Sequence, residues 1–325
     1  MKNACVIMGD TVGYLIQALV LAKSIRDTQT ECDILLLYLP YDLESVKIFS
    51  AVSNRGKAEK IKQNRINADN FLEENSALIN ELNIQLIRVT EKPYNTTAIK
   101  NPNYRNILNQ SPTCALDLHK ILCWNYTQYS KVLFLDADIL VRKNLDHLFD
   151  LDYDFMYSDG AASPLNSGVF CLRPDSLVFK DLSQIIHEGN FSYEEGWNNL
   201  GRQHKYFNAI EVCQGLFYYH FIKGTKQFKT HKLSRNIYNN QAPYDIFCEN
   251  KLPKERYLRQ LISFDDVCIA HFTSWGRLYK KGNEPMWNCP DFGQVKINGK
   301  VNDKLKVPFH QEWVDTFLRL EIKGG

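Results

Sequence analysis

The sequence predicts an α/β fold in which a mixed, mostly parallel sheet is flanked by helices, in a single domain with a C-terminal extension. The first observation is the opening of the chain, where apolar segments 4–8 and 33–39 enclose an amphipathic segment, 14–26. Strands that alternate with helices are typical of parallel sheets with crossover helices. The second observation is the apolar run from Lys131 to Leu135, which has the pattern of a strand buried on both faces.

The other segments continue this alternation. Before the buried run we expect a helix over 43–52, a charged insertion or peripheral helices over 54–83, a strand over 84–89, a long loop over 90–112 and a helix over 113–129. The loop is expected because its segment is polar and holds three prolines. After the run we expect strands over 154–157, 168–172 and 267–272, and helices over 176–187, 214–222 and 312–322. The main domain then spans 1–287, with 54–112 as its variable region, and the extension spans 288–325.

The amino-acid composition indicates which classes of binding partner can be expected. The 325 residues include 39 Lys and Arg against 37 Asp and Glu, so no overall field attracts nucleic acid or an anionic membrane. Nine cysteines are scattered without a Cys-x-x-Cys pair, which is typical of buried thiols in a reducing compartment. The chain starts without a signal-peptide pattern and holds no apolar stretch of ~20 residues. We therefore expect a soluble cytoplasmic protein with no membrane span and no nucleic-acid partner.

The buried run ends in two carboxylates, Asp136 and Asp138, separated by Ala137. Open α/β sheets bind their ligands at the carboxyl ends of strands. Carboxylate oxygens suit hard cations such as Mg²⁺ and Mn²⁺, and such a cation can stabilise a diphosphate leaving group. The same pair also fits a solvated turn after a strand, so the motif alone leaves metal binding open.

Several further motifs converge on one family. They are Asn166-Ser167-Gly168-Val169-Phe170, Gln214-Gly215, His271-Phe272, Gly276 and Lys280-Lys281. The most specific stretch runs from Leu118 through Trp124 and Lys131 into the Asp-x-Asp pair. Over about residues 3–287 the chain resembles glycogenin-like members of glycosyltransferase family 8, which are retaining enzymes with a Rossmann-like GT-A fold. The resemblance implies transfer of a hexose, most simply glucose, from a UDP-sugar to a hydroxyl acceptor.

The resemblance also implies a metal site and a diphosphate site. Asp136, Asp138 and His271 would ligate Mn²⁺, with Mg²⁺ as the alternative ion. Taken by itself, His271 also fits a core histidine bonded to the backbone. Lys120 corresponds to a donor-binding lysine of the family. A solvated helix position is the alternative for this lysine, but it lies among apolar residues. The diphosphate contacts correspond to Gly276, Lys280 and Lys281.

The remaining roles concern the nucleoside and the sugar. Uridine contacts correspond to Met8, Asp10, Thr11 and Tyr14, with Ala137 beside the ribose. Asp10 could accept from the uracil N–H and Tyr14 could stack on the base, although Asp10 also suits a helix cap. The sugar-binding candidates are Asp159 and Asn166, and Ser167 is a further donor-binding candidate. The catalytic set implied by the resemblance is Gln214, Lys120 and Asp159.

Two departures from the family pattern leave alternatives open. The family has an Asp before Gln-Gly, where this chain has Cys213, and extra residues separate His271 from the lysine pair. A catalytically inactive UDP-sugar-binding protein is therefore one alternative. A haloacid-dehalogenase-type phosphatase, in which the first Asp of the pair is a nucleophile, is another. The donor could also be UDP-galactose. The acceptor could be a glycan, a polyol, a protein or a tyrosine of the chain such as Tyr238 or Tyr244, and the oligomeric state is open, a homodimer included.

Overall fold

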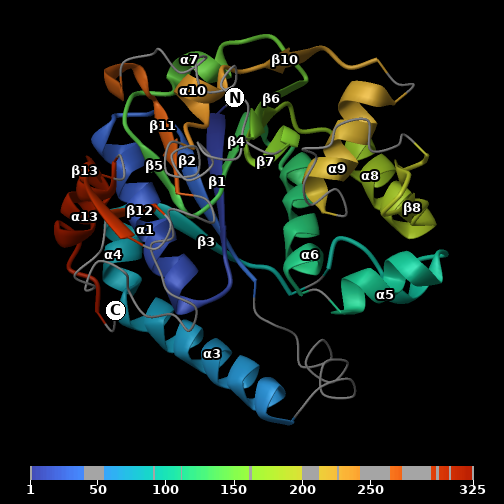
Figure 1. The fold of residues 1–325 in the computed structure, drawn as a ribbon, viewed down its shortest axis with the longest axis horizontal. Helices are drawn as coiled ribbons and strands as arrows, with labels where there is room; N and C mark the ends of the chain where they lie inside the picture. The colour runs from blue at the N-terminus through green and yellow to red at the C-terminus, as the bar shows by residue number, and fades with distance from the viewer. Residues whose placement is uncertain are drawn as a thin grey trace.

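The computed structural model describes residues 2–39, 55–90, 92–110, 112–160, 163–199, 212–224, 227–241, 264–272, 294–297, 300–306 and 309–323. Its centre is a seven-stranded sheet in the order β10-β6-β7-β4-β1-β2-β3 (Figure 1). The strands are β1 (Lys2–Gly9), β2 (Asp33–Tyr38), β3 (Ile84–Arg88), β4 (Tyr129–Leu135), β6 (Phe155–Gly160), β7 (Ser163–Leu172) and β10 (Thr230–Lys232). Only β7 runs against its neighbours in this sheet, so the predicted mixed, mostly parallel sheet is confirmed.

Helices cover both faces of the sheet. In the first half of the chain, the described helices are α1 (Val12–Asp27), α3 (Arg55–Glu74), α4 (Ser76–Glu81), η1 (Thr96–Ala98), α5 (Pro102–Gln110), α6 (Pro112–Asp117) and η2 (Leu118–Asn125). The later ones are α7 (Asp146–Phe149), α8 (Ser176–Glu188), α9 (Cys213–Phe217), the π-helix η3 (Tyr218–Lys223), α10 (Arg235–Tyr238), η5 (Phe264–Asp266) and α13 (His310–Leu318). In Figure 1, α1 and α13 lie on one side of the sheet, and α6, α8 and α9 on the other.

The strands β1 and β4 lie between two hydrophobic layers, one on each face of the sheet. Successive side chains of a strand point to opposite faces, and here Leu133 and Leu135 pack with α1 while Val132 and Phe134 pack with η2, α8 and α9. These β4 side chains are fully buried. The second layer is aromatic, and Phe170 of β7 lies at its centre, stacked on Phe134 at 4.9 Å. The apolar run was therefore correctly predicted to be a strand buried on both faces.

The expectation of a long loop over 90–112 was wrong. This segment contains η1 and α5, and the side chain of Asn101 caps α5 by accepting hydrogen bonds from the amides of Asn103 and Tyr104. Tyr104 is fully buried, and its ring lies 4.8 Å from that of Trp197. Burial of an aromatic side chain stabilises this helix, although its own sequence is polar.

Other element boundaries also differ from the expectations. The helix expected over 113–129 is instead α6 followed by η2, because Tyr129 already pairs with Lys2 in the sheet. The aromatic helix expected over 214–222 divides into α9 and η3. The unpredicted short strands are β5 (Ile139–Val141), β8 (Phe191–Ser192), β9 (Gly196–Trp197), β10, β12 (Gln294–Ile297) and β13 (Lys300–Lys306). The strand β11 (Ile269–His271) is shorter than expected. The helix expected over 43–52 lies outside the described residues.

Within the described part of the chain, no helix has the length and apolar character that crossing a bilayer requires. The cysteines described there are free thiols, and most of them are buried. This agrees with the expectation that they serve as small apolar side chains. The two sulfur atoms of Cys5 and Cys32 lie 3.2 Å apart without a disulfide.

Candidate metal and donor site

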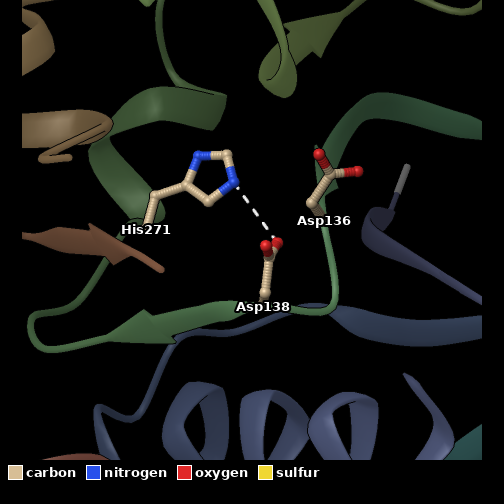
Figure 2. A group of neighbouring side chains, drawn as sticks. All are labelled: Asp136, Asp138 and His271. Carbon is tan, nitrogen blue, oxygen red and sulfur yellow. Dashed lines mark ion pairs between the residues drawn. The ribbon is translucent and has the colours of Figure 1, made fainter. Parts of the chain in front are cut away.

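The carboxyl end of β4 brings three ionisable side chains together. The amide of Asp136 donates to the carbonyl oxygen of Gly168 at 2.9 Å, which continues the β4–β7 ladder by one residue. Immediately after Asp138 the chain forms β5, and β11 pairs with β5 so that His271 lies opposite Ile139. The amide of Phe272 donates to the carbonyl of Asp138 at 2.8 Å. This ladder places the His271 imidazole beside the Asp138 carboxylate (Figure 2).

The three side chains offer oxygen and nitrogen atoms that all lie within 4.8 Å of one another. His271 Nε2 is 3.3 Å from Asp138 Oδ1 (Figure 2). Burial would lower the pKa of His271, but the Asp138 and Asp136 carboxylates together outweigh it, so the net shift of the imidazole pKa is upward. Burial likewise pushes the pKa of Asp138 upward, but His271, a backbone hydrogen bond and Lys120 together outweigh it, and the pKa lies below its ordinary value. For Asp136, burial dominates and raises the pKa.

The tautomer of His271 follows from the backbone. The amide of Gly168 can only donate, so the Asn166 atom that it contacts at 3.0 Å is an oxygen. Asn239 therefore presents its amide nitrogen to that oxygen, at 3.1 Å, and the same nitrogen lies 3.3 Å from the carbonyl oxygen of Asp159. The other terminal atom of Asn239 is then an oxygen, which lies 2.7 Å from His271 Nδ1. Because this oxygen only accepts, Nδ1 carries a proton and Nε2 faces the carboxylates.

Asn239 is the residue of this group that sequence reasoning missed. Its side chain is fully buried directly after α10, and it connects His271 to Asn166. Metal-binding histidines typically donate their second ring N–H to such a partner, which fixes the ring and its tautomer. No spacing in the sequence relates position 239 to position 271. The parallel bridge between Asn240 and Ala270, together with the hydrogen bond from the Cys268 amide to the Ile237 carbonyl, brings the two segments together.

Gly168 has no side chain, and this leaves space between His271 and Asp136. A Cβ atom built on this residue would lie 2.5 Å from His271 Cε1 and 2.6 Å from Asp136 Oδ2, both inside normal contact distance. Two carboxylates and one imidazole suit Mn²⁺ or Mg²⁺ and leave coordination positions for diphosphate oxygens. The residues therefore fit the divalent cation that the resemblance implies.

Lys120 is a buried cation next to this group. Its Nζ lies 2.9 Å from Asp136 Oδ1 and 2.6 Å from Asp117 Oδ1, and the side chain is 4% exposed. It also donates to the carbonyl oxygen of Ser167 at 3.1 Å. Burial would lower the pKa of Lys120, but the two carboxylates outweigh burial and raise it. The interpretation of Lys120 as a solvated helix position is therefore wrong, and the lysine is charged inside the protein.

The nucleoside candidates lie at the same edge of the sheet. In the parallel β1–β4 ladder, Ile7 pairs with Leu135, so Met8 lies next to the position of Asp136. Thr11 occupies the N-cap position of α1, and this position therefore does not fall on Asp10. Tyr14 is 49% exposed in the first turn of α1. Ala137 is buried between the two carboxylates.

The sugar candidates are brought close to one another. Ser158 of β6 pairs with Asn166 of β7, which brings Asp159 next to that asparagine. Asp159 forms an ion pair with Lys232 at 2.9 Å, a partner that the sequence did not indicate. Gln214 is buried in the first turn of α9. Gly276, Lys280 and Lys281 lie outside the described residues, as does Tyr244.

Comparisons with known proteins identify the family of this chain. The family model for glycosyl transferase family 8 matches residues 5–209. Human glycogenin-2 is 30% identical over 229 residues, which are 67% of this chain and 45% of that protein. Human glycogenin-1 is 40% identical over 86 residues, which are 26% of this chain and 25% of that protein. The chain therefore spans less than half of the length of these relatives.

Solved structures show the same fold at low sequence identity. The apo-form glycosyltransferase GlyE in Streptococcus pneumoniae TIGR4 superposes with a TM-score of 0.53 at 16% identity, over 98% of this chain and 60% of that one. The WbbM bifunctional glycosyltransferase gives 0.51 at 12% identity, over 97% and 51%. The phosphatase alternative is excluded by the family match, and the Asp-x-Asp pair follows β4 rather than the first strand. The chain belongs to glycosyltransferase family 8 and has the GT-A fold.

Proposed function

We propose that this transferase is a cation-dependent, retaining hexosyltransferase that uses a UDP-sugar, with glucose as the hexose and Mn²⁺ as the ion. The observation that supports this proposal best is the convergence of Asp136, Asp138 and His271 within 4.8 Å at the carboxyl end of β4. A divalent cation held there would supply neutralisation of charge on the departing diphosphate. Glucose rests on the glycogenin resemblance, and UDP-galactose is the nearest competitor.

The described residues suggest how the donor is held. Lys120 adds a fixed positive charge next to Asp136, in a buried position where it needs little rearrangement during reaction. Asn166, which Asn239 links to His271, and Asp159 of the neighbouring strand would bind sugar hydroxyls. Gln214 would lie near the reacting carbon, and no carboxylate nucleophile is assigned there. We therefore propose front-face attack by the acceptor hydroxyl, which retains the configuration of the sugar.

Thermal unfolding with UDP tests the metal assignment. A ligand that binds only the folded state raises the melting temperature. UDP should do so strongly with Mn²⁺ and weakly with EDTA, because diphosphate and cation complete each other's coordination. Asp138→Asn should abolish this difference while the unliganded protein stays folded. Asp152→Asn is the matched control, since Asp152 pairs with Arg173 and Lys229 at the surface. Equal stabilisation by UDP with and without the cation contradicts the metal assignment.

Release of UDP from a panel of donors tests the sugar. UDP-glucose should be hydrolysed or transferred in preference to UDP-N-acetylglucosamine, because a pocket that hydrogen-bonds sugar hydroxyls rejects ligands that leave its polar groups unpaired. A clear preference for the N-acetylated donor would overturn this part of the proposal. Retention is checked by the anomeric configuration of the product.

A catalytically inactive UDP-sugar-binding protein is the second candidate, and Cys213 is the observation that favours it. Burial and the neighbouring Asp117 raise the pKa of this thiol well above its ordinary value, so it stays neutral. Metal-dependent UDP binding without any release of UDP from UDP-hexoses would establish this alternative.

We propose a hydroxyl acceptor and a cytoplasmic location. Free thiols are consistent with a reducing compartment, and cell fractionation tests the location. Among tyrosines of the chain, Tyr238 places its hydroxyl 2.8 Å from His147 Nε2. Intact-protein mass spectrometry after incubation with UDP-glucose distinguishes modification of the chain from transfer to a separate glycan, polyol or protein.

A further inference from the structure

Asp117 is a partly buried carboxylate that the proposed roles do not include. It is the last residue of α6, and its side chain is 16% exposed. One oxygen, Oδ1, lies 2.6 Å from Lys120 Nζ. The other, Oδ2, accepts the backbone N–H of Cys213 at 2.9 Å. Asp117 therefore contacts the buried lysine and the first residue of α9 at the same time.

The two segments are also joined by a second contact. The Cys213 thiol lies 2.9 Å from the carbonyl oxygen of Asp117, to which it donates. Gln214, the next residue, is buried in the first turn of α9. The position of Gln214 is therefore tied to Asp117 through both the main chain and the side chain of Cys213.

The charges around Lys120 form a continuous row. The ammonium lies between Asp117, at 2.6 Å, and Asp136, at 2.9 Å. Only Asp136 belongs to the candidate cation site. The ammonium and the Asp117 carboxylate offset each other, so the negative charges of Asp136 and Asp138 remain available to a cation. Without Asp117, Lys120 would have Asp136 as its one carboxylate partner in the row and would add an uncompensated positive charge beside the cation.

We propose that Asp117 is a positioning residue of the transferase site, which shares the Lys120 ammonium with Asp136 and fixes the start of α9. Its carboxylate supplies next to Cys213 the negative charge that the neutral thiol lacks. The inference rests on the proposed function. It also offers a reason why Cys213 is compatible with activity, since the charge comes from position 117 instead of position 213.

Asp117→Asn tests the role of the charge, because the amide oxygen still accepts from the Cys213 amide. We expect kcat for UDP release to fall about tenfold or more, with KM for the donor within about threefold. The Mn²⁺ concentration for half-maximal activity should rise several-fold, because a nearby negative charge is lost. Asp152→Asn is the control, as a charge removal at the surface that should change none of these values. Values for Asp117→Asn equal to those of the unmodified chain would overturn the proposal.

Moving the carboxylate separates positioning from general stability. Cys213→Asp alone places two carboxylates next to each other and should lower the melting temperature. In the Asp117→Asn/Cys213→Asp double variant, one carboxylate is present again, so the melting temperature should recover and kcat should rise above that of Asp117→Asn. This comparison is a double-mutant cycle and also works when Asp117→Asn folds poorly. Additive changes in melting temperature, with no recovery of kcat, contradict the proposal.

A failure of the proposed transferase activity can be distinguished from a failure of the role proposed for Asp117. If the unmodified chain releases no UDP from any UDP-hexose with Mn²⁺, the transferase proposal fails. The Mn²⁺ requirement for UDP stabilisation, measured by thermal unfolding, then still tests Asp117. A several-fold higher requirement in Asp117→Asn supports the contact with the cation site, and an unchanged requirement refutes it.

Discussion

At the scale of single residues, Gly168 shows how little space the candidate site can lose. Gly168→Ala would place a methyl carbon 2.5 Å from His271 Cε1 and 2.6 Å from Asp136 Oδ2. Because neither side chain can retreat without breaking the ligand set, we expect loss of Mn²⁺-dependent UDP stabilisation. Gly160→Ala is the control: its nearest contact, Asn166 Cβ, would be at 3.3 Å, and a small shift relieves it. If the alanine at 168 keeps full cation-dependent binding, the site is not where these residues place it.

Asn239 gives a second expectation at this scale. Asn239→Ala removes the acceptor that orients His271 through Nδ1, and such partners typically contribute about 10–100-fold in metal affinity. Asn239→Asp keeps an acceptor at the same place and should lose less. Isothermal titration of Mn²⁺ in the presence of UDP measures both. Equal affinities in the alanine variant and the unmodified chain would mean that the imidazole is not a ligand.

Single site residues could be predicted from the sequence where side chains of suitable chemistry directly follow a recognisable strand. Asp136 and Asp138 follow a fully buried strand, and their position at its end could be predicted without the structure. His271 was identified only through the family resemblance, because its proximity depends on pairing between distant segments. Asp117 and Asn239 carried no sequence signal, since neither residue belongs to a motif or to a spacing that indicates a site. Whether the assigned residues bind the donor stays a prediction.

At the scale of elements, the pairing of β5 with β11 brings Asp138 and His271 together. Arg142 follows β5, and its guanidinium donates to the carbonyl oxygens of Phe264 and Val267, just before β11. It also pairs with Glu312 of α13 and lies over the Phe309 ring at 4.5 Å. Arg142 therefore connects both strands to the C-terminal helix.

Arg142→Ala should destabilise the protein by about 1–3 kcal/mol, because two carbonyl groups lose a charged donor. Glu312→Gln should cost much less, on the order of 0–1 kcal/mol, since Glu312 is 48% exposed and exposed ion pairs contribute little. Urea unfolding with and without Mn²⁺ and UDP measures both. A glutamine variant as unstable as the alanine variant would show that the ion pair, rather than the carbonyl contacts, holds the elements together.

Strands and helices with strong periodicity were predictable, and those formed by tertiary contacts were not. The segments that became β1, α1, β2, β4 and α8 have clear apolar patterns and appear near their expected places. α5 was missed because its stability comes from Tyr104 and Leu108 packing in the core. β5 and β11 are too short to give a period, and their pairing with each other defines them.

At the scale of the whole molecule, a buried histidine predicts sensitivity to acid. Burial lowers the pKa of His119 to about 4, while the unfolded chain should titrate near 6.5. Between these values the unfolded state binds more protons, so stability rises with pH and is lost as the pH falls from about 6.5 to about 4. The loss amounts to about 3 kcal/mol from this group.

His119→Asn tests this, because an amide nitrogen can replace Nδ1 as donor to the carbonyl oxygens of Ala115 and Leu116. The slope of unfolding free energy against pH should flatten between pH 6.5 and pH 4, and the two proteins should differ little in slope above pH 7. An unchanged slope in the variant would assign the acid sensitivity to other groups.

The register of β11 against β5 has a consequence for the order in which the chain folds. Asp136 and Asp138 lie in the middle of the sequence, but His271 joins them only after a distant segment docks beside Ile139. Closure of such a long loop is entropically costly, so this contact should form after the transition state for folding. Interactions that form late slow unfolding without accelerating folding. Binding of the donor and the cation together should therefore slow unfolding, which lengthens the lifetime of the native state, and should leave the refolding rate almost unchanged.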